Sequence, residues 1–129
     1  MGYRFHHIHI ICEDLEGMIR FFTEVLGARI ILRRRFGTAD GASLDLAGSI
    51  VNLRVARQDE TVEHSAGTKY GYDHLGVEVE DFQKSYEELR AKGLEFYTQP
   101  QESHGIRYAF FKGPEGLRFE LVQRLNQPG

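Results

Sequence analysis

The sequence contains an internal repeat, and this repeat limits what the chain can fold into. Residues 7–15 read HIHIICEDL and residues 74–82 read HLGVEVEDF. In both segments a histidine starts a short alternating apolar strand, and an aspartate followed by a large apolar residue ends it. The two histidines are 67 positions apart, and so are the two aspartates, Asp14 and Asp81. Agreement at two landmarks in one register predicts two copies of one structural unit.

The segments that follow these landmarks agree as well. Asp14 and Asp81 are expected N-cap residues, because their carboxylates can accept from the free amides of a first helical turn. Apolar residues follow at helical spacing up to Gly27 in the first copy and Gly93 in the second. Three segments with strand character come after each helix. They are residues 28–35, 42–47 and 49–57 in the first copy, and 94–98, 107–112 and 117–124 in the second.

This order predicts an α+β fold of two tandem βαβββ modules, whose strands form a curved mixed sheet with a concave face. The first module is expected at residues 1–57 and the second at residues 73–129, as one paired-module domain. Residues 58–72 are polar and contain glycine, which is typical of a linker. Because strands hold side chains rigidly, a concave sheet is a suitable place for a site.

Composition narrows the class of protein. The chain has 129 residues, 41% of them hydrophobic, and a formal net charge of −3, so a general nucleic-acid surface is not expected. A single cysteine excludes an intrachain disulfide and fits a reducing compartment. No apolar run is long enough to cross a bilayer, and the N-terminus has no signal-peptide pattern. We therefore expect a cytoplasmic protein with no membrane or nucleic-acid partner.

The repeat suggests a metal site. His7 and His74 are expected at equivalent places on the two first strands, and His9 shares a strand face with His7. Glu120 lies in the apolar segment LRFELVQ, where a carboxylate is costly unless it binds a cation. Two imidazoles and one carboxylate with open positions suit Fe(II), Mn(II) or Zn(II). Taken one at a time, each of these side chains is also compatible with an ordinary hydrogen-bonded strand residue.

The sequence resembles the vicinal oxygen chelate superfamily, which includes glyoxalase I, methylmalonyl-CoA epimerase, extradiol dioxygenases and bleomycin-resistance proteins. The resemblance is carried by residues 7–27, 73–82 and 113–123. It implies the paired fold, often as a homodimer, with a concave metal site in the curved mixed sheet that holds one divalent ion (Fe, Mn, Co, Ni or Zn). It also implies that His7, His74 and Glu120 occupy three metal-ligand positions.

The fourth metal-ligand position departs from glyoxalase I. Aligning FELVQ with VNLRV places Asn52 where the resemblance implies Glu in glyoxalase I and Gln in methylmalonyl-CoA epimerase. Asn52 can offer a carbonyl oxygen to an ion, or it can be a strand residue that only hydrogen-bonds nearby. A neutral group here removes one candidate base, which argues against two-base chemistry.

The first candidate reaction is that of a metal-dependent isomerase, epimerase or lyase. Its substrate would be a small 2-oxo or 2-hydroxy acid or thioester, chelated through adjacent oxygens. Such a reaction needs a base, for which Glu120, His9 and Asp45 are candidates. Asp45 lies in the alternating segment SLDL and is equally compatible with a solvated strand residue.

Two other functions remain open. A non-haem Fe(II) extradiol-type dioxygenase would use the same three ligands, but the tyrosine implied by the resemblance is Phe110 here. Tyr108 keeps the same strand face and His104 could supply an acid–base group. A metal-free drug-binding protein of the bleomycin-resistance type would not need the three ligands together.

Basic residues suggest an anionic substrate. Arg33, Arg35 and Arg54 are candidates for binding a carboxylate or phosphate, with Phe110 beside the substrate. The alternative is that the arginines form a solvated edge that resists strand pairing.

Overall fold

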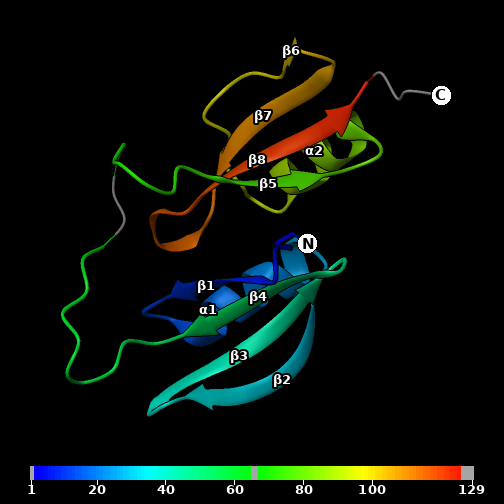
Figure 1. Ribbon diagram of the computed structural model, residues 1–129. Coiled ribbons are helices and arrows are strands. Elements are labelled where there is room, and N and C mark those ends of the chain that lie inside the picture. Colours follow the sequence, from blue (N-terminus) through cyan, green and yellow to red (C-terminus); the bar gives the residue numbers. More distant parts are fainter. Residues whose placement is uncertain (1, 65–66, 126–129) are drawn as a thin grey trace. The chain divides into compact units, whose positions relative to one another are not determined.

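The computed structural model describes residues 2–64 and 67–125. The chain divides into two compact units, Met1–Glu63 and His64–Gly129, which are called here the first and the second module. The division falls within the segment 58–72. Each module has the order strand, helix and three strands, and each helix lies against one face of its own sheet (Figure 1). The prediction of two tandem βαβββ modules is confirmed.

The first module has a four-stranded mixed sheet in the order β1-β4-β3-β2, with β1 parallel to β4 and the other pairs antiparallel. Its elements are β1 (His7–Ile11), α1 (Leu15–Arg20), the π-helix η1 (Phe21–Val25), β2 (Arg29–Phe36), β3 (Ala39–Leu46) and β4 (Ser49–Arg54).

The helix of the first module begins as predicted and ends differently. The Asp14 carboxylate accepts from the Gly17 amide, which caps the first turn. The α-helix ends at Arg20, and the expected last turns form the π-helix η1, in which the Leu26 amide donates to the Phe21 carbonyl. The wider turn accompanies the burial of two consecutive rings, Phe21 and Phe22.

Alternation separates an apolar and a polar face in the first sheet. Ala42, Leu44, Val51 and Leu53 are buried in the core against the helix. The residues between them point the other way. We call this other face the first polar face, and it carries His7, His9, Ser43, Asn52 and Arg54.

The second module repeats this arrangement with the order β5-β8-β7-β6. Its elements are β5 (Leu75–Glu78), α2 (Phe82–Ala91), β6 (Gln101–Ser103), β7 (Ile106–Lys112), the 3₁₀-helix η2 (Pro114–Gly116) and β8 (Arg118–Arg124). The Asp81 carboxylate caps α2 by accepting from the Lys84 amide, as predicted. None of the described helices is long and apolar enough to span a membrane.

The predicted strand at residues 94–98 is wrong. In this segment Phe96 makes only an isolated bridge with Phe111, and the strand that pairs with β7 is β6. The reason is the turn: His104 and Gly105 both have positive φ (52° and 77°) and form a two-residue hairpin loop that sets the pairing of residues 101–103.

The second sheet also has an apolar and a polar face. Phe111, Phe119 and Leu121 are buried against α2 together with Phe82. The opposite face, which we call the second polar face, carries Gly76, Tyr108, Phe110, Arg118 and Glu120.

Candidate metal centre

Strand register makes Asn52 the structural counterpart of Glu120. In the first module His9 pairs with Asn52 across the parallel strands β1 and β4. In the second module Gly76, which is 67 residues after His9, pairs with Glu120 across β5 and β8. The equivalence of Asn52 and Glu120 that the sequence predicts is therefore also found in the strand pairing of the two modules.

The second module brings two of the expected ligands together. His74 Nε2 lies 3.2 Å from Glu120 Oε1, and the side chains of His74 and Glu120 are 30% and 17% exposed. The other ring nitrogen, Nδ1, lies 2.8 Å from Asp73 Oδ2. The hydrogen bond with His74 holds the pKa of the Asp73 carboxyl below its ordinary value, and the Arg118 charge adds to this effect.

This pair fits a divalent ion. Two ligand atoms that each lie about 2.1 Å from an ion are ~3.0–3.4 Å apart at angles between octahedral and tetrahedral. The separation of 3.2 Å between Nε2 and Oε1 falls in that range. A ligating histidine also usually donates its second ring N–H to a carboxylate, which is the position of Asp73. Donor chemistry and spacing therefore agree with a metal site.

His7 lies in the first module, at the start of β1, and is exposed. Its Nδ1 lies 2.7 Å from His6 Nδ1. Among the residues that the structure describes, no three His, Cys, Asp or Glu side chains come together in a group that could hold a metal ion. Ligation by His7 therefore stays a prediction.

Asn52 has a partner within its own sheet. The Ser43 hydroxyl donates to Asn52 Oδ1 at 2.6 Å. Since a carbonyl oxygen has two lone pairs, this bond leaves one acceptor position on Oδ1. The structure thus supports a hydrogen-bonding role for Asn52. The remaining acceptor position is compatible with Asn52 as a metal ligand.

His9 is packed against an aromatic ring. Its imidazole lies 4.5 Å from the Phe36 ring, measured between centroids, and 6.5 Å from the His7 ring. His9 is an exposed residue, but partial desolvation of its ring, followed by the charge of Arg54, lowers the pKa of His9 from its ordinary value. His9 is therefore a predominantly neutral imidazole at neutral pH.

Two of the other candidate residues have structural partners. Asp45 Oδ1 accepts from the Gly48 amide and Oδ2 pairs with Arg29, so this carboxylate caps the turn between β3 and β4. Tyr108 donates to Gln101 Oε1 across β6 and β7.

The third candidate, His104, lies in the hairpin turn, where Ser103 Oγ is 2.6 Å from its Nδ1. The rise of β7 from Ile106 to Phe110 alone is ~13 Å. His104 therefore lies far from Glu120, the cross-strand partner of Phe110.

The three predicted substrate-binding arginines already pair with carboxylates. Arg33 makes a two-pronged contact with Glu16 of α1, at 2.7 and 2.9 Å, and so lies on the helix side of the sheet. Arg35 pairs with Asp40, and the buried Arg54 pairs with Glu60. Their proposed role in substrate binding stays a prediction.

Arg34 differs from its neighbours. Its guanidinium lies 4.4 Å from the centre of the Phe36 ring, which in turn contacts His9. Among the residues that the structure describes, Arg34 makes no ion pair. Its positive charge contributes to lowering the pKa of His9.

The sequence analysis did not single out Asp73, Ser43 or Arg118 as functional residues. Asp73 could have been found, because it directly precedes His74 as His6 precedes His7. The positions of Ser43 and Arg118 depend on strand register, which the sequence did not give.

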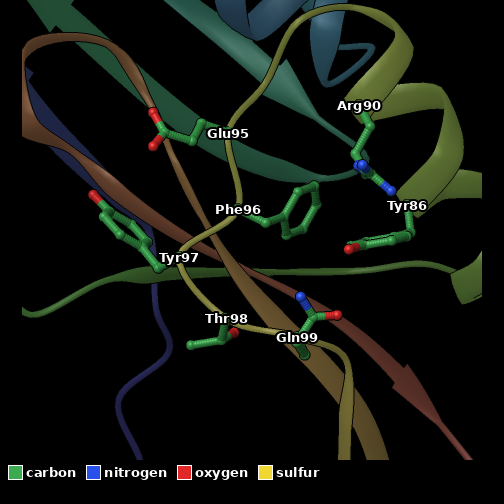
Figure 2. Close-up of a pocket in the computed structure, with 7 residues that line it drawn as sticks. All are labelled: Tyr86, Arg90, Glu95, Phe96, Tyr97, Thr98 and Gln99. Atoms are coloured by element: carbon green, nitrogen blue, oxygen red, sulfur yellow. The ribbon is translucent and has the colours of Figure 1, made fainter.

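A pocket of about 400 Å³ lies elsewhere in the second module, between α2 and the segment 95–99. Figure 2 shows Phe96 pointing toward Tyr86 and Arg90, while Tyr97 points to the other side of the segment. Neither His74 nor Glu120 lines this pocket. The contact between His74 and Glu120 is therefore separate from this pocket.

A family model described as the Glyoxalase/Bleomycin resistance protein/Dioxygenase superfamily matches residues 4–121. The chain belongs to this superfamily, as its resemblance predicted. Most members are metal-dependent enzymes, among them lyases, epimerases and dioxygenases.

Individual relatives agree with this assignment. Lactoylglutathione lyase GLX1 of Arabidopsis thaliana is 30% identical over 94% of this chain, but the chain spans only 44% of that protein. The uncharacterized protein YwkD of Bacillus subtilis (strain 168) is 32% identical over 92% of this chain and 95% of its own length. A solved glyoxalase family protein from Bacillus cereus has a TM-score of 0.82 at 21% identity, covering 98% of this chain and 97% of its own.

Proposed function

We propose that this chain is a metal-dependent lyase or isomerase of the glyoxalase type. The observation that carries the proposal is the contact between His74 Nε2 and Glu120 Oε1 on the second polar face. Its substrate would be a small 2-oxo or 2-hydroxy acid or thioester with two adjacent oxygens. Membership of the superfamily supports the class of enzyme, whereas the particular reaction is our inference.

Four residues would hold the ion: His7, His74 and Glu120, with Asn52 through its carbonyl oxygen. A bound divalent ion supplies Lewis acidity, which favours the oxyanion that develops when a carbon next to a carbonyl loses a proton. Gly76 leaves room beside the ligands, because a Cβ at this position would lie 3.9 Å from Glu120 Oε1, its nearest neighbour.

The arrangement favours chemistry with a single carboxylate base. Glu120 has a neutral counterpart in Asn52, and Asp45 is held by Arg29 and Gly48. Glu120 and the neutral imidazole of His9 remain as groups on the polar faces that can accept a proton. We therefore expect removal and return of one proton, rather than shuttling between two carboxylates.

Arg34 is the residue of β2 best placed to attract an anionic substrate. It combines a guanidinium without a carboxylate partner, among the described residues, with contact to the Phe36 ring beside His9. A planar guanidinium suits a carboxylate or a phosphate. We propose that it takes the role first assigned to Arg33 and Arg35. We also propose that the active form is a homodimer, as the resemblance implies.

A dioxygenase is the second candidate, because the proposed set of two histidines and one carboxylate suits oxygen chemistry. Against it stands Phe110, whose ring lies 4.9 Å from the His74 ring, between centroids, and which pairs with Glu120. This position offers no hydroxyl group to the site. We therefore rank proton transfer above oxygen insertion.

The proposed reaction class is tested by proton exchange. Protein loaded with Mn(II), Co(II), Ni(II) or Zn(II) is incubated in D₂O with 2-oxo acids, 2-hydroxy acids and thioesters, and deuterium incorporation is followed by NMR. We expect exchange that falls about 10²-fold or more in Glu120→Gln. Glu78→Gln is the matched control, since Glu78 lies on neighbouring β5 and pairs with Arg124.

Oxygen uptake with a panel of catechols under Fe(II) is measured in parallel. Robust uptake without deuterium exchange would replace our proposal with the dioxygenase. Equal exchange rates in Glu120→Gln and Glu78→Gln would remove Glu120 from the reaction. Drug binding by protein that takes up no metal would favour the metal-free binding protein.

A further inference from the structure

The residue before His7 and the residue before His74 each contact the Nδ1 atom of the histidine that follows. Asp73 Oδ2 lies 2.8 Å from His74 Nδ1, and His6 Nδ1 lies 2.7 Å from His7 Nδ1. Since the two copies are offset by 67 residues, Asp73 is the counterpart of His6. In both modules the preceding side chain occupies Nδ1 and leaves Nε2 for another partner.

In the second module this contact belongs to a longer chain of polar groups. Arg118 donates to Asp73 Oδ1 at 3.3 Å, Asp73 Oδ2 meets His74 Nδ1, and His74 Nε2 faces Glu120. Arg118 and Glu120 are two residues apart on β8 and therefore share one strand face.

The backbone at the start of this chain of groups is also fixed. The Tyr72 hydroxyl donates to the Arg118 carbonyl at 3.0 Å, which ties the segment before β5 to the first residue of β8. The Arg118 guanidinium lies 5.7 Å from the Phe110 ring centre. The Tyr72 bond thus helps to fix Arg118, which in turn donates to the Asp73 carboxylate.

We infer that Asp73 is a positioning residue for the metal centre, acting through His74. This inference rests on the proposed function. The Asp73 carboxylate accepts the Nδ1–H of His74, which fixes the orientation of the ring and leaves the lone pair on Nε2, beside Glu120. Asp73 does not touch the ion or the substrate, because it contacts the ring at the nitrogen opposite the ligating one.

Zinc affinity of the metal-stripped chain tests this role. Dissociation constants for Zn(II) are measured by competition with a chromophoric chelator for the wild type, Asp73→Asn and Asp73→Ala. We expect Asp73→Ala to weaken zinc binding about 10–100-fold, the usual effect of losing such a partner. Asp73→Asn keeps an acceptor oxygen without the charge and should lie between the two.

Asp40→Asn is the matched control. Asp40 is an exposed aspartate that pairs with Arg35 in the first module, so this variant also removes a carboxylate from an arginine pair. The thermal midpoint of each metal-free variant is measured to show that it is folded. A Co(II) absorption spectrum supplies a second readout, which we expect to change in Asp73→Ala and to match the wild type in Asp40→Asn.

The outcomes separate the inference from the proposed function. Zinc affinities and Co(II) spectra that are the same in Asp73→Ala and Asp40→Asn would overturn the role of Asp73 and leave the metal enzyme intact. A wild-type chain that binds neither Zn(II) nor Co(II) would overturn the proposed function and this inference together.

Discussion

Asn52 and Glu120 hold the same place in two copies of one strand, but their cross-strand neighbours differ. Ser43 pairs with Asn52 and gives its amide oxygen a hydrogen bond. Phe110 pairs with Glu120, and its side chain offers no hydrogen bond to the Glu120 carboxylate. Glu120 Oε1 contacts His74 Nε2 instead. The negative charge of the proposed centre therefore resides in the second module.

This asymmetry predicts unequal effects of ligand removal. Asn52→Ala is expected to weaken Zn(II) binding by about tenfold, or ~1.4 kcal/mol, because a neutral ligand is lost. Glu120→Ala is expected to weaken it by ~10²-fold or more, since two imidazoles then face the ion without a charged partner. Zn(II) affinities are measured by chelator competition. Equal losses of affinity in the two variants would show that the charge of Glu120 does not make it the stronger ligand.

Glu60 gives the first module a pH-dependent contact. Hydrogen bonds from Arg54 and from the Arg57 amide lower the pKa of its carboxyl from 4.5 to about 2. Because the folded-state pKa lies below the ordinary value, this contribution to stability is complete above about pH 4.5 and is lost as the pH falls toward 2.

Glu60→Gln is therefore expected to lower the thermal midpoint near neutral pH, and the gap to the wild type should close between pH 4.5 and pH 2. Thermal melts across this range measure the gap. Glu63→Gln removes a carboxylate from the same segment and serves as the control. A gap that does not change with pH would contradict the assigned role of Glu60.

At the scale of elements, two strand glycines differ in what surrounds them. A Cβ at Gly41 of β3 would collide with the Leu53 carbonyl oxygen and would lie 2.7 Å from the Phe36 ring, which crosses the strand there to reach His9. A Cβ at Gly76 of β5 would meet only Glu120 Oε1, at 3.9 Å. The first glycine is required for packing and the second is not.

Gly41→Ala is expected to destabilise the fold by about 1–3 kcal/mol, because the ring and the strand must both move. Gly76→Ala should stay within about 0.5 kcal/mol of the wild type, as for other substitutions that meet no clash. Urea denaturation of both variants measures the difference. Similar losses in the two variants would show that Phe36 does not need the space above Gly41.

The elements could largely be predicted where local chemistry defines them. The caps at Asp14 and Asp81 and the strands β3, β4, β7 and β8 follow from side-chain patterns that extend over a few residues. The apolar pattern predicts a strand at residues 94–98 but does not reveal the left-handed turn at His104, which sets the pairing of residues 101–103 with β7 instead.

For the whole molecule, the repeat was sufficient to predict the fold and the equivalence of Asn52 and Glu120. It could not predict the ion pairs of Arg33 and Arg54, because their partners Glu16 and Glu60 depend on how helix and loop pack against the sheet. Charge patterns along a strand indicate where arginines lie, but not which of them remain available to a substrate.

The central proposal is that His7, His74 and Glu120 are ligands of a bound divalent ion. Metal content of protein purified without chelators tests it most directly, in the wild type, His7→Ala and Glu120→Ala, with His104→Ala as the control. We predict about one divalent ion per chain in the wild type and the control, and a large loss in the other two variants. Equal metal content in all four proteins would contradict the claim.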